Sequence, residues 1–279
     1  MWALLRMSAL ILIAVVSGFS RADAPLQVLT SIKPLQLIAL AVGGNEVKVD
    51  ALLDPRGSPH DYQLRPSDRA KLDAADAVFW VGPQLEHFLQ PALKVLSARV
   101  TVVALQDHMA DPHIWIDPVA MQTVAQQMAT VYSALRPARA EYFRANALRV
   151  QAELQQSDRF LQHLFPVDAP RRGYIVEHDA YSRFEGRYGL KHLAALTDNS
   201  DLPPSVSTVL KVKRLLDSGE IACALAEIQE SSQLRALTED RSIRLIKLDS
   251  LAANVPISDQ ALPDFYRQLG ESIAGCLKI

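Results

Sequence analysis

The segment from residue 138 to residue 164 contains neither glycine nor proline, and this feature constrains the fold most. Its 27 residues are dominated by strong helix formers such as alanine, glutamate, glutamine, arginine and leucine. A continuous helix of that length spans roughly 40 Å, which exceeds what one small lobe needs. We therefore interpret it as a strut that joins two lobes. The alternative is a helix packed wholly within one domain.

The chain on both sides of this segment alternates short apolar runs with helix-like stretches. The expected strands are residues 26–30, 47–53, 77–81, 100–105, 174–176, 193–196, 221–226 and 243–248. The expected helices are residues 34–42, 66–75, 84–96, 118–135, 180–188, 205–217, 231–239 and 262–277. Such alternation is typical of α/β folds with parallel sheets.

The predicted fold is therefore α/β, with two lobes of mainly parallel four-stranded sheets joined by one long rigid helix. Residues 25–137 are expected to form the N-terminal α/β lobe, and residues 138–165 the connecting helix. Residues 166–279 are expected to form the C-terminal α/β lobe.

The first residues of the chain predict export. Arg6 precedes an apolar stretch at residues 8–16, and small residues follow up to an A-x-A sequence at residues 22–24. This order is typical of a secretory signal peptide, which we place at residues 1–24. The net charge of −2, without any block of like charge, argues against a nucleic-acid partner, which would favour a basic patch.

The chain has two cysteines, Cys223 and Cys276. In an exported protein they meet an oxidising compartment, where a disulfide is expected. The alternative is a pair of buried free thiols.

The sequence DPHIWIDP at residues 111–118 places His113 between two Asp-Pro pairs. Pro112 keeps the residue before it out of the helical region, so the chain arrives extended. Asp117 and Pro118 have the residue types of a helix N-cap and of the first helical position. His113 is therefore expected on a short, stiff segment between a strand and a helix. Taken alone, this segment favours a surface loop that carries an incidental histidine, and the functional interpretation gains weight because His60 and His178 lie at similar breaks.

Four candidate metal ligands share one topological position, because each follows a predicted strand directly or after a short loop. They are His60, His113, His178 and Asp249. In open α/β sheets ligands bind at the carboxyl ends of the strands. Two candidates precede the long helix and two follow it, so facing lobes would bring all four into the cleft between them.

Three imidazoles and one carboxylate suit a borderline divalent cation, and Zn²⁺ fits best. Manganese would favour more oxygen ligands. The histidines bind metal only when neutral, so affinity is expected to fall as the pH drops towards about 6.5. Glu177 and Asp179 flank His178, and either is a candidate to orient its ring or to be a solvated charge.

Several motifs together resemble a known family. They are VLTSIKPL at residues 28–35, GSPHDYQLRPSD at 57–68, VGPQLE at 81–86, HIWIDP at 113–118, HDAY at 178–181 and LDSL at 248–251. This set is similar to the cluster A-I metal-binding proteins of ABC importers, and most closely to the ZnuA-like zinc-uptake group. The resemblance runs along nearly the whole chain after the signal peptide.

The resemblance implies a periplasmic solute-binding protein, expected to be a monomer, that carries Zn²⁺ as its transported ligand to an ABC-type import permease. His60, His113 and His178 match the three histidine ligands of the family. Asp249 matches a fourth, carboxylate position that some members use, whereas others take an oxygen from a loop residue or water. The two cysteines match the disulfide of the ZnuA-like group.

Two departures stand out. Pro59 stands where some members have an acidic residue, and residues 106–112 replace the long histidine-rich loop of many zinc-binding members. Manganese-binding relatives tend to carry a carboxylate at the position of His178. The alternatives are a manganese carrier or adhesin of the same fold, or a secreted zinc hydrolase with Asp249 or Glu177 as base. No H-E-x-x-H or G-x-S-x-G motif supports the hydrolase.

Overall fold

The structure, a computed structural model, describes residues 24–60, 62–106, 111–166, 172–197, 203–228, 231–241 and 243–277. The predicted signal peptide at residues 1–24 lies outside this part of the chain, except for Ala24. Within the described residues, no helix combines the length and apolarity needed to cross a membrane.

The N-terminal half forms a four-stranded parallel sheet in the order β2-β1-β3-β4. Its strands are β1 (Leu26–Thr30), β2 (Val47–Ala51), β3 (Ala77–Trp80) and β4 (Thr101–Ala104). The helices that follow these strands are α1 (Lys33–Gly43), η1 (Gly44–Glu46), α2 (Pro66–Ala74), η2 (His87–Leu89), α3 (Gln90–Lys94) and η3 (Ile114–Ile116). Every residue of β3 is buried, as expected for a central strand covered on both faces.

The C-terminal half repeats this topology, with a four-stranded parallel sheet in the order β6-β5-β7-β8. Its strands are β5 (Gly173–His178), β6 (Ala194–Thr197), β7 (Ile221–Glu227) and β8 (Arg244–Leu248). Its helices are α6 (Ser182–Tyr188), α7 (Val206–Asp217) and α8 (Ser232–Thr238). The two parallel sheets confirm the predicted fold class.

The predicted long helix is confirmed. It consists of η4 (Pro137–Arg139) and α5 (Ala140–Leu164), and it packs along α4 (Pro118–Leu135). The buried residues of α5 recur mostly every three or four positions, which is the period of an amphipathic helix. They are Phe143, Ala147, Val150, Leu154, Ser157, Asp158 and Leu161.

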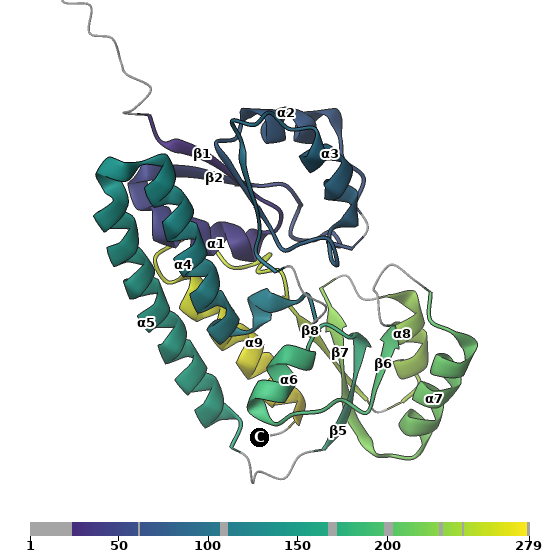
Figure 1. Ribbon diagram of the computed structural model, residues 1–279. Helices are drawn as coiled ribbons and strands as arrows, with labels where there is room; N and C mark the ends of the chain where they lie inside the picture. Colours follow the sequence, from purple (N-terminus) through teal and green to yellow (C-terminus); the bar gives the residue numbers. More distant parts are fainter. Residues whose placement is uncertain are drawn as a thin grey trace, which may run out of the picture.

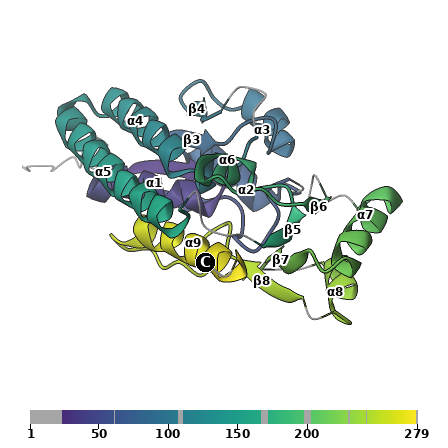
Figure 2. The same cartoon turned by 90° about the horizontal axis from the view of Figure 1, so that it is seen from below.

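A second helix also joins the two halves. The last helix, α9 (Ala261–Leu277), contacts the strands β5, β7 and β8 of the C-terminal sheet, and also α1 and α5. Figures 1 and 2 show α9 beside α5, with α1 and α4 on the same side of the molecule. A Cβ atom at Gly270 of α9 would collide with Leu161 of α5, so the two helices approach each other closely. One hydrophobic cluster therefore runs through residues of both halves.

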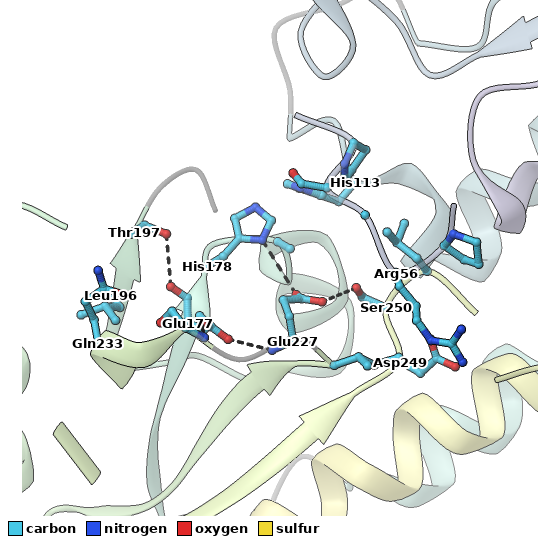
Figure 3. Close-up of a pocket in the computed structure, with 18 of the residues that line it drawn as sticks. Arg56, His113, Glu177, His178, Leu196, Thr197, Glu227, Gln233, Asp249 and Ser250 are labelled. Atoms are coloured by element: carbon cyan, nitrogen blue, oxygen red, sulfur yellow. Dashed lines mark hydrogen bonds and ion pairs between the residues drawn. The ribbon is translucent and has the colours of Figure 1, made fainter. Parts of the chain in front are cut away.

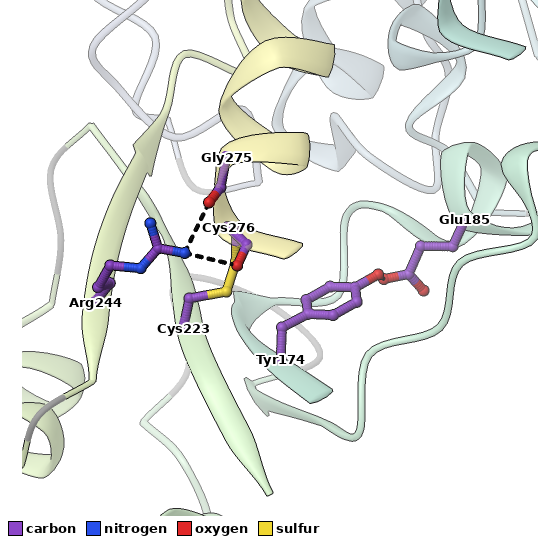
Figure 4. Close-up of a disulfide and its surroundings, with 6 residues drawn as sticks. All are labelled: Tyr174, Glu185, Cys223, Arg244, Gly275 and Cys276. Carbon is purple, nitrogen blue, oxygen red and sulfur yellow. Dashed lines mark hydrogen bonds between the residues drawn. A yellow bond between two sulfur atoms is a disulfide. The ribbon is translucent and has the colours of Figure 1, made fainter. Parts of the chain in front are cut away.

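The disulfide predicted from the sequence is present. Cys223 of β7 and Cys276 of α9 are bonded, with their Cα atoms 5.6 Å apart. Figure 4 shows Arg244 beside this bond, where its Nη2 donates to the carbonyl oxygens of Gly275 at 2.7 Å and Cys276 at 3.0 Å. The end of α9 is thus fastened to the C-terminal sheet by one covalent bond and two hydrogen bonds.

The predicted helix at residues 84–96 is wrong in its first part. The Glu86 side chain is fully buried and accepts a hydrogen bond from the Gly82 amide at 3.1 Å, which stabilises a turn instead. Helix α3 starts only at Gln90, where Pro91 occupies an early helical position that needs no amide donor.

Candidate metal centre

Three of the four predicted ligands converge. His60 lies in the loop after β2, His113 directly precedes η3, and His178 is the last residue of β5. One ring nitrogen from each lies within 4.8 Å of the others. The Nε2 atoms of His60 and His113 are 3.3 Å apart, and the ring centroids of His113 and His178 are 4.9 Å apart. Figure 3 shows His113 and His178 near each other at the edge of the cavity.

The burial of these rings is unusual for polar side chains. His113 is 3% exposed and His178 is 5% exposed. The Nε2 atom of His178 is buried without a hydrogen-bond partner among the described residues. Leaving a buried polar atom unpaired is costly, unless a ligand supplies its partner. Converging imidazole nitrogens with one such unpaired atom fit a tetrahedral zinc site with an open position.

The local sequence explains how His113 is held. The Asp111 carboxylate accepts hydrogen bonds from the backbone amide of His113 at 3.0 Å and from its Nδ1 at 2.6 Å. Because a carboxylate only accepts, Nδ1 carries the proton and Nε2 keeps its lone pair for a metal. On the far side, Asp117 caps α4 through the Val119 amide, and Pro118 occupies the first turn, as the sequence predicts.

His178 lies beside a carboxylate that the sequence analysis missed. The Oε1 atom of Glu227 lies 3.9 Å from the Nδ1 atom of His178. The Glu227 carboxylate also accepts hydrogen bonds from the hydroxyls of Tyr181 at 2.8 Å and Ser250 at 2.6 Å (Figure 3). Burial would raise the pKa of Glu227, but the nearby His178 ring and the hydrogen bonds from Ser250 and Tyr181 outweigh it and lower this pKa. Glu227 therefore stays ionised beside the imidazole.

The two acidic residues that flank His178 accept hydrogen bonds from other parts of the C-terminal half. The Glu177 carboxylate accepts hydrogen bonds from the backbone amides of Glu227, at 2.9 Å, and Ser231. Asp179 accepts a hydrogen bond from the Ser182 hydroxyl at 2.8 Å.

The sequence did carry a signal for Glu227, because it directly follows the predicted strand at residues 221–226.

Asp249 is not brought into the cluster. It follows β8 as predicted, but its two carboxylate oxygens accept hydrogen bonds from the amides of Ala253 at 2.6 Å and Asn254 at 2.7 Å. In Figure 3 it lies next to Arg56, beyond Ser250 as seen from His178. Among the described residues, the group whose ligand atoms meet within 4.8 Å contains the three histidines without Asp249.

A cavity of about 440 Å³ adjoins the histidines. Residues from both halves line it, including Arg56 and Trp115 from the N-terminal half and Glu227 and Ser250 from the C-terminal half. Figure 3 shows the cavity between the ribbons of the two halves. The position left open by the three imidazoles therefore has room for solvent.

Comparison with known proteins gives consistent matches along the chain. A family model described as "Zinc-uptake complex component A periplasmic" (ZnuA) matches residues 28–276. The high-affinity zinc uptake system protein ZnuA of Haemophilus ducreyi is 32% identical over 289 residues, which cover 90% of this chain and 93% of that protein.

Two solved structures have a similar fold. A crystal structure of ZnuA aligns with a TM-score of 0.80 at 22% identity, over 91% of this chain and 99% of that one. The laminin binding protein Lmb of Streptococcus agalactiae, described as having adhesin and metal transporting activity, aligns with a TM-score of 0.79 at 20% identity. That alignment covers 90% of this chain and 99% of Lmb. At these identities the two likenesses establish the fold alone.

Proposed function

Because this chain belongs to the ZnuA family of periplasmic zinc-uptake components, we propose that it captures Zn²⁺ between its two sheets and delivers it to the permease of an ABC importer. The observation that carries the proposal is the convergence of His60, His113 and His178, which come from both halves of the chain. Proteins of this family bind and carry a solute and catalyse no reaction. The metal is thus the cargo of the protein.

The ligands are proposed to be the three histidines together with one water molecule. Three neutral imidazoles match the nitrogen donors that zinc favours, and manganese would favour more oxygen. The fourth position opens to a cavity, and both oxygens of Asp249 face their own backbone loop. We therefore assign the fourth position to solvent in preference to Asp249.

The periplasm is the proposed location. The family description names that compartment, and the disulfide between Cys223 and Cys276 agrees with an oxidising one. Cleavage of residues 1–24, the monomeric state and the domain boundaries near residues 137 and 165 remain predictions.

The function can be tested with the chain that begins at residue 25. Calorimetric titration is expected to give one Zn²⁺ per chain and much weaker Mn²⁺ binding. The zinc-loaded protein is then added to its cognate permease in lipid nanodiscs, where it should stimulate ATP hydrolysis more than the metal-free protein. Equal binding of Mn²⁺ would favour the manganese-carrier alternative, and an absence of Zn²⁺ binding would refute the proposal.

Zinc binding is expected to tolerate mild acid. Burial, followed by repulsion from charge on His178 and His113, lowers the pKa of His60 to about 3, and burial also lowers the pKa of His113. A lowered pKa keeps an imidazole neutral to lower pH, so protons compete less with the metal. Three ordinary imidazoles with a pKa of about 6.5 would lose about a thousandfold in affinity by about pH 5.5.

We expect a clearly smaller loss over the same range, because the pKa values of His60 and His113 are lowered. Competition titrations with a zinc chelator at a series of pH values would measure the change. This expectation replaces the sequence-based one, in which affinity falls as the pH nears 6.5, and a thousandfold loss would contradict it.

A further inference from the structure

Arg183, in the first turn of α6, bridges the two halves of the chain beside the metal centre. Its Nε donates to the carbonyl oxygen of Asp111 at 2.6 Å, and its Nη2 donates to Oε1 of Gln106 at 3.1 Å. Its backbone amide donates to Oδ2 of Asp111 at 3.1 Å. Arg183 thus contacts the N-terminal half at three acceptor atoms, although it lies 72 residues after Asp111.

The contacted residue is the one that holds His113. Oδ1 of Asp111 accepts hydrogen bonds from the amide and from Nδ1 of His113, while Oδ2 accepts the Arg183 amide. Both oxygens of this carboxylate are therefore occupied, each by a partner from a different half. Gln106 also donates to the carbonyl of Asp111 at 3.1 Å, so the guanidinium closes a small network around that carbonyl.

The same helix follows the third ligand closely, since α6 begins four residues after His178. We propose that Arg183 is a positioning residue for the zinc site. Through Asp111 it holds the His113 ring in the orientation that coordinates metal. It also fixes the distance between His113 and His178 in the metal-free protein. This inference rests on the proposed zinc-binding function and deepens it, because it places part of the metal affinity in a residue that never touches the ion. Residues that hydrogen-bond a metal-binding histidine directly, as Asp111 does, typically contribute 10- to 100-fold to metal affinity, and Arg183 acts through Asp111.

The chain offers a matched control on the same helix. Arg187, one turn after Arg183, donates to the Asp158 carboxylate through Nε at 2.5 Å and Nη2 at 2.6 Å. Asp158 belongs to α5, and among the described residues the hydrogen bonds of the Arg187 guanidinium go to Asp158 and not to Asp111. Arg187→Met removes a guanidinium from α6, as Arg183→Met does, but it leaves the Asp111 network intact.

The test compares Arg183→Met, Arg187→Met and the unmodified chain by Zn²⁺ titration and by the absorption spectrum of the Co²⁺-loaded protein. Arg183→Met keeps the backbone amide that binds Oδ2 of Asp111 but removes both guanidinium contacts. It is therefore expected to raise the zinc dissociation constant severalfold, up to about tenfold, and to shift the Co²⁺ ligand-field bands. Arg187→Met is expected to lower the melting temperature but to leave the dissociation constant and the Co²⁺ spectrum unchanged. In an Asp111→Ala background, Arg183→Met should add little further loss, because the carboxylate that passes its effect to His113 is gone.

Unchanged zinc affinity and Co²⁺ bands in Arg183→Met would overturn the inference, as would equal losses in the two arginine variants. If Arg183→Met does not fold, Arg183→Lys replaces it. Its compact ammonium cannot reach both Asp111 and Gln106, so an intermediate affinity is expected and an unchanged one would refute the inference. The unmodified chain separates the two proposals. If it does not bind zinc, the proposed function is refuted. If it binds zinc and Arg183→Met has the same dissociation constant, only the positioning role is refuted.

Discussion

Replacing His113 with alanine is expected to weaken zinc binding roughly 100- to 1,000-fold while the protein stays folded. Zinc sites with four ligands are worth about 10–16 kcal/mol, which is roughly 2.5–4 kcal/mol for each ligand. Removal of one such ligand converts to the stated range of affinities. His60→Ala and His178→Ala should behave alike, because the three nitrogens form one group. Competition titration with a chelator measures the change, and circular dichroism checks the fold.

Two further variants make this result specific. Asp249→Asn is expected to change the dissociation constant less than about tenfold, because the structure ties this carboxylate to its own loop and away from the histidines. His163→Ala, at an exposed position near the end of α5, is expected to have no effect. Unchanged affinity in all three ligand variants would refute the site. A loss in Asp249→Asn as large as theirs would restore Asp249 as a direct ligand.

Loss of the disulfide is expected to lower the free energy of unfolding by about 4 kcal/mol. Cys223 and Cys276 are 53 residues apart, and the chain-entropy relation gives this value as an upper guide for a loop of that length. For a chain of this size the loss corresponds to a melting temperature about 8–16 °C lower. Differential scanning calorimetry of Cys223→Ala/Cys276→Ala against the oxidised protein measures it. Both cysteines are fully buried, so the variant also removes packed sulfur atoms.

The reduced unmodified protein, refolded in a thiol reductant, separates these two effects. It keeps both sulfur atoms but lacks the covalent bond. If its melting temperature matches that of the oxidised protein while the double variant is destabilised, packing accounts for the loss and the cross-link contributes little.

The sequence predicted helices best where their ends carry specific residues. Helix α4 has the predicted bounds, because Asp117 and Pro118 set its start and the Arg136-Pro137 pair stops it. The helix at residues 84–96 was predicted from composition, and its first part is wrong because tertiary packing buries Glu86 in a turn. The burial of Glu86 depends on the rest of the fold, which helix propensity does not contain, and the buried carboxylate then binds the nearby Gly82 amide.

The position of the site was predictable, but its side-chain directions were not. Parallel strands bring their carboxyl ends to one edge, so residues that follow strands meet there whatever their spacing in the sequence. This rule found His60, His113 and His178, and it also selected Asp249, whose carboxylate turns towards its own loop. Glu227 also satisfies this rule, because it directly follows the predicted strand at residues 221–226, but the sequence analysis did not apply the rule to it. Strand position determines where a backbone lies, and the partners available locally determine where a carboxylate points.

The return of α9 to the N-terminal half has a consequence for biogenesis. Residues 261–277 supply Phe265, Tyr266 and Leu269 to the same hydrophobic cluster that contains Val28 of the first strand. Contacts between residues so far apart in the sequence slow folding. The apolar surface of the N-terminal half that α9 covers stays exposed until those contacts form, and exposed apolar surface promotes aggregation. A polypeptide is synthesised from its N-terminus onward. The N-terminal sheet therefore cannot complete its hydrophobic packing until residues 261–277 have been made, and its apolar surface stays uncovered for that time.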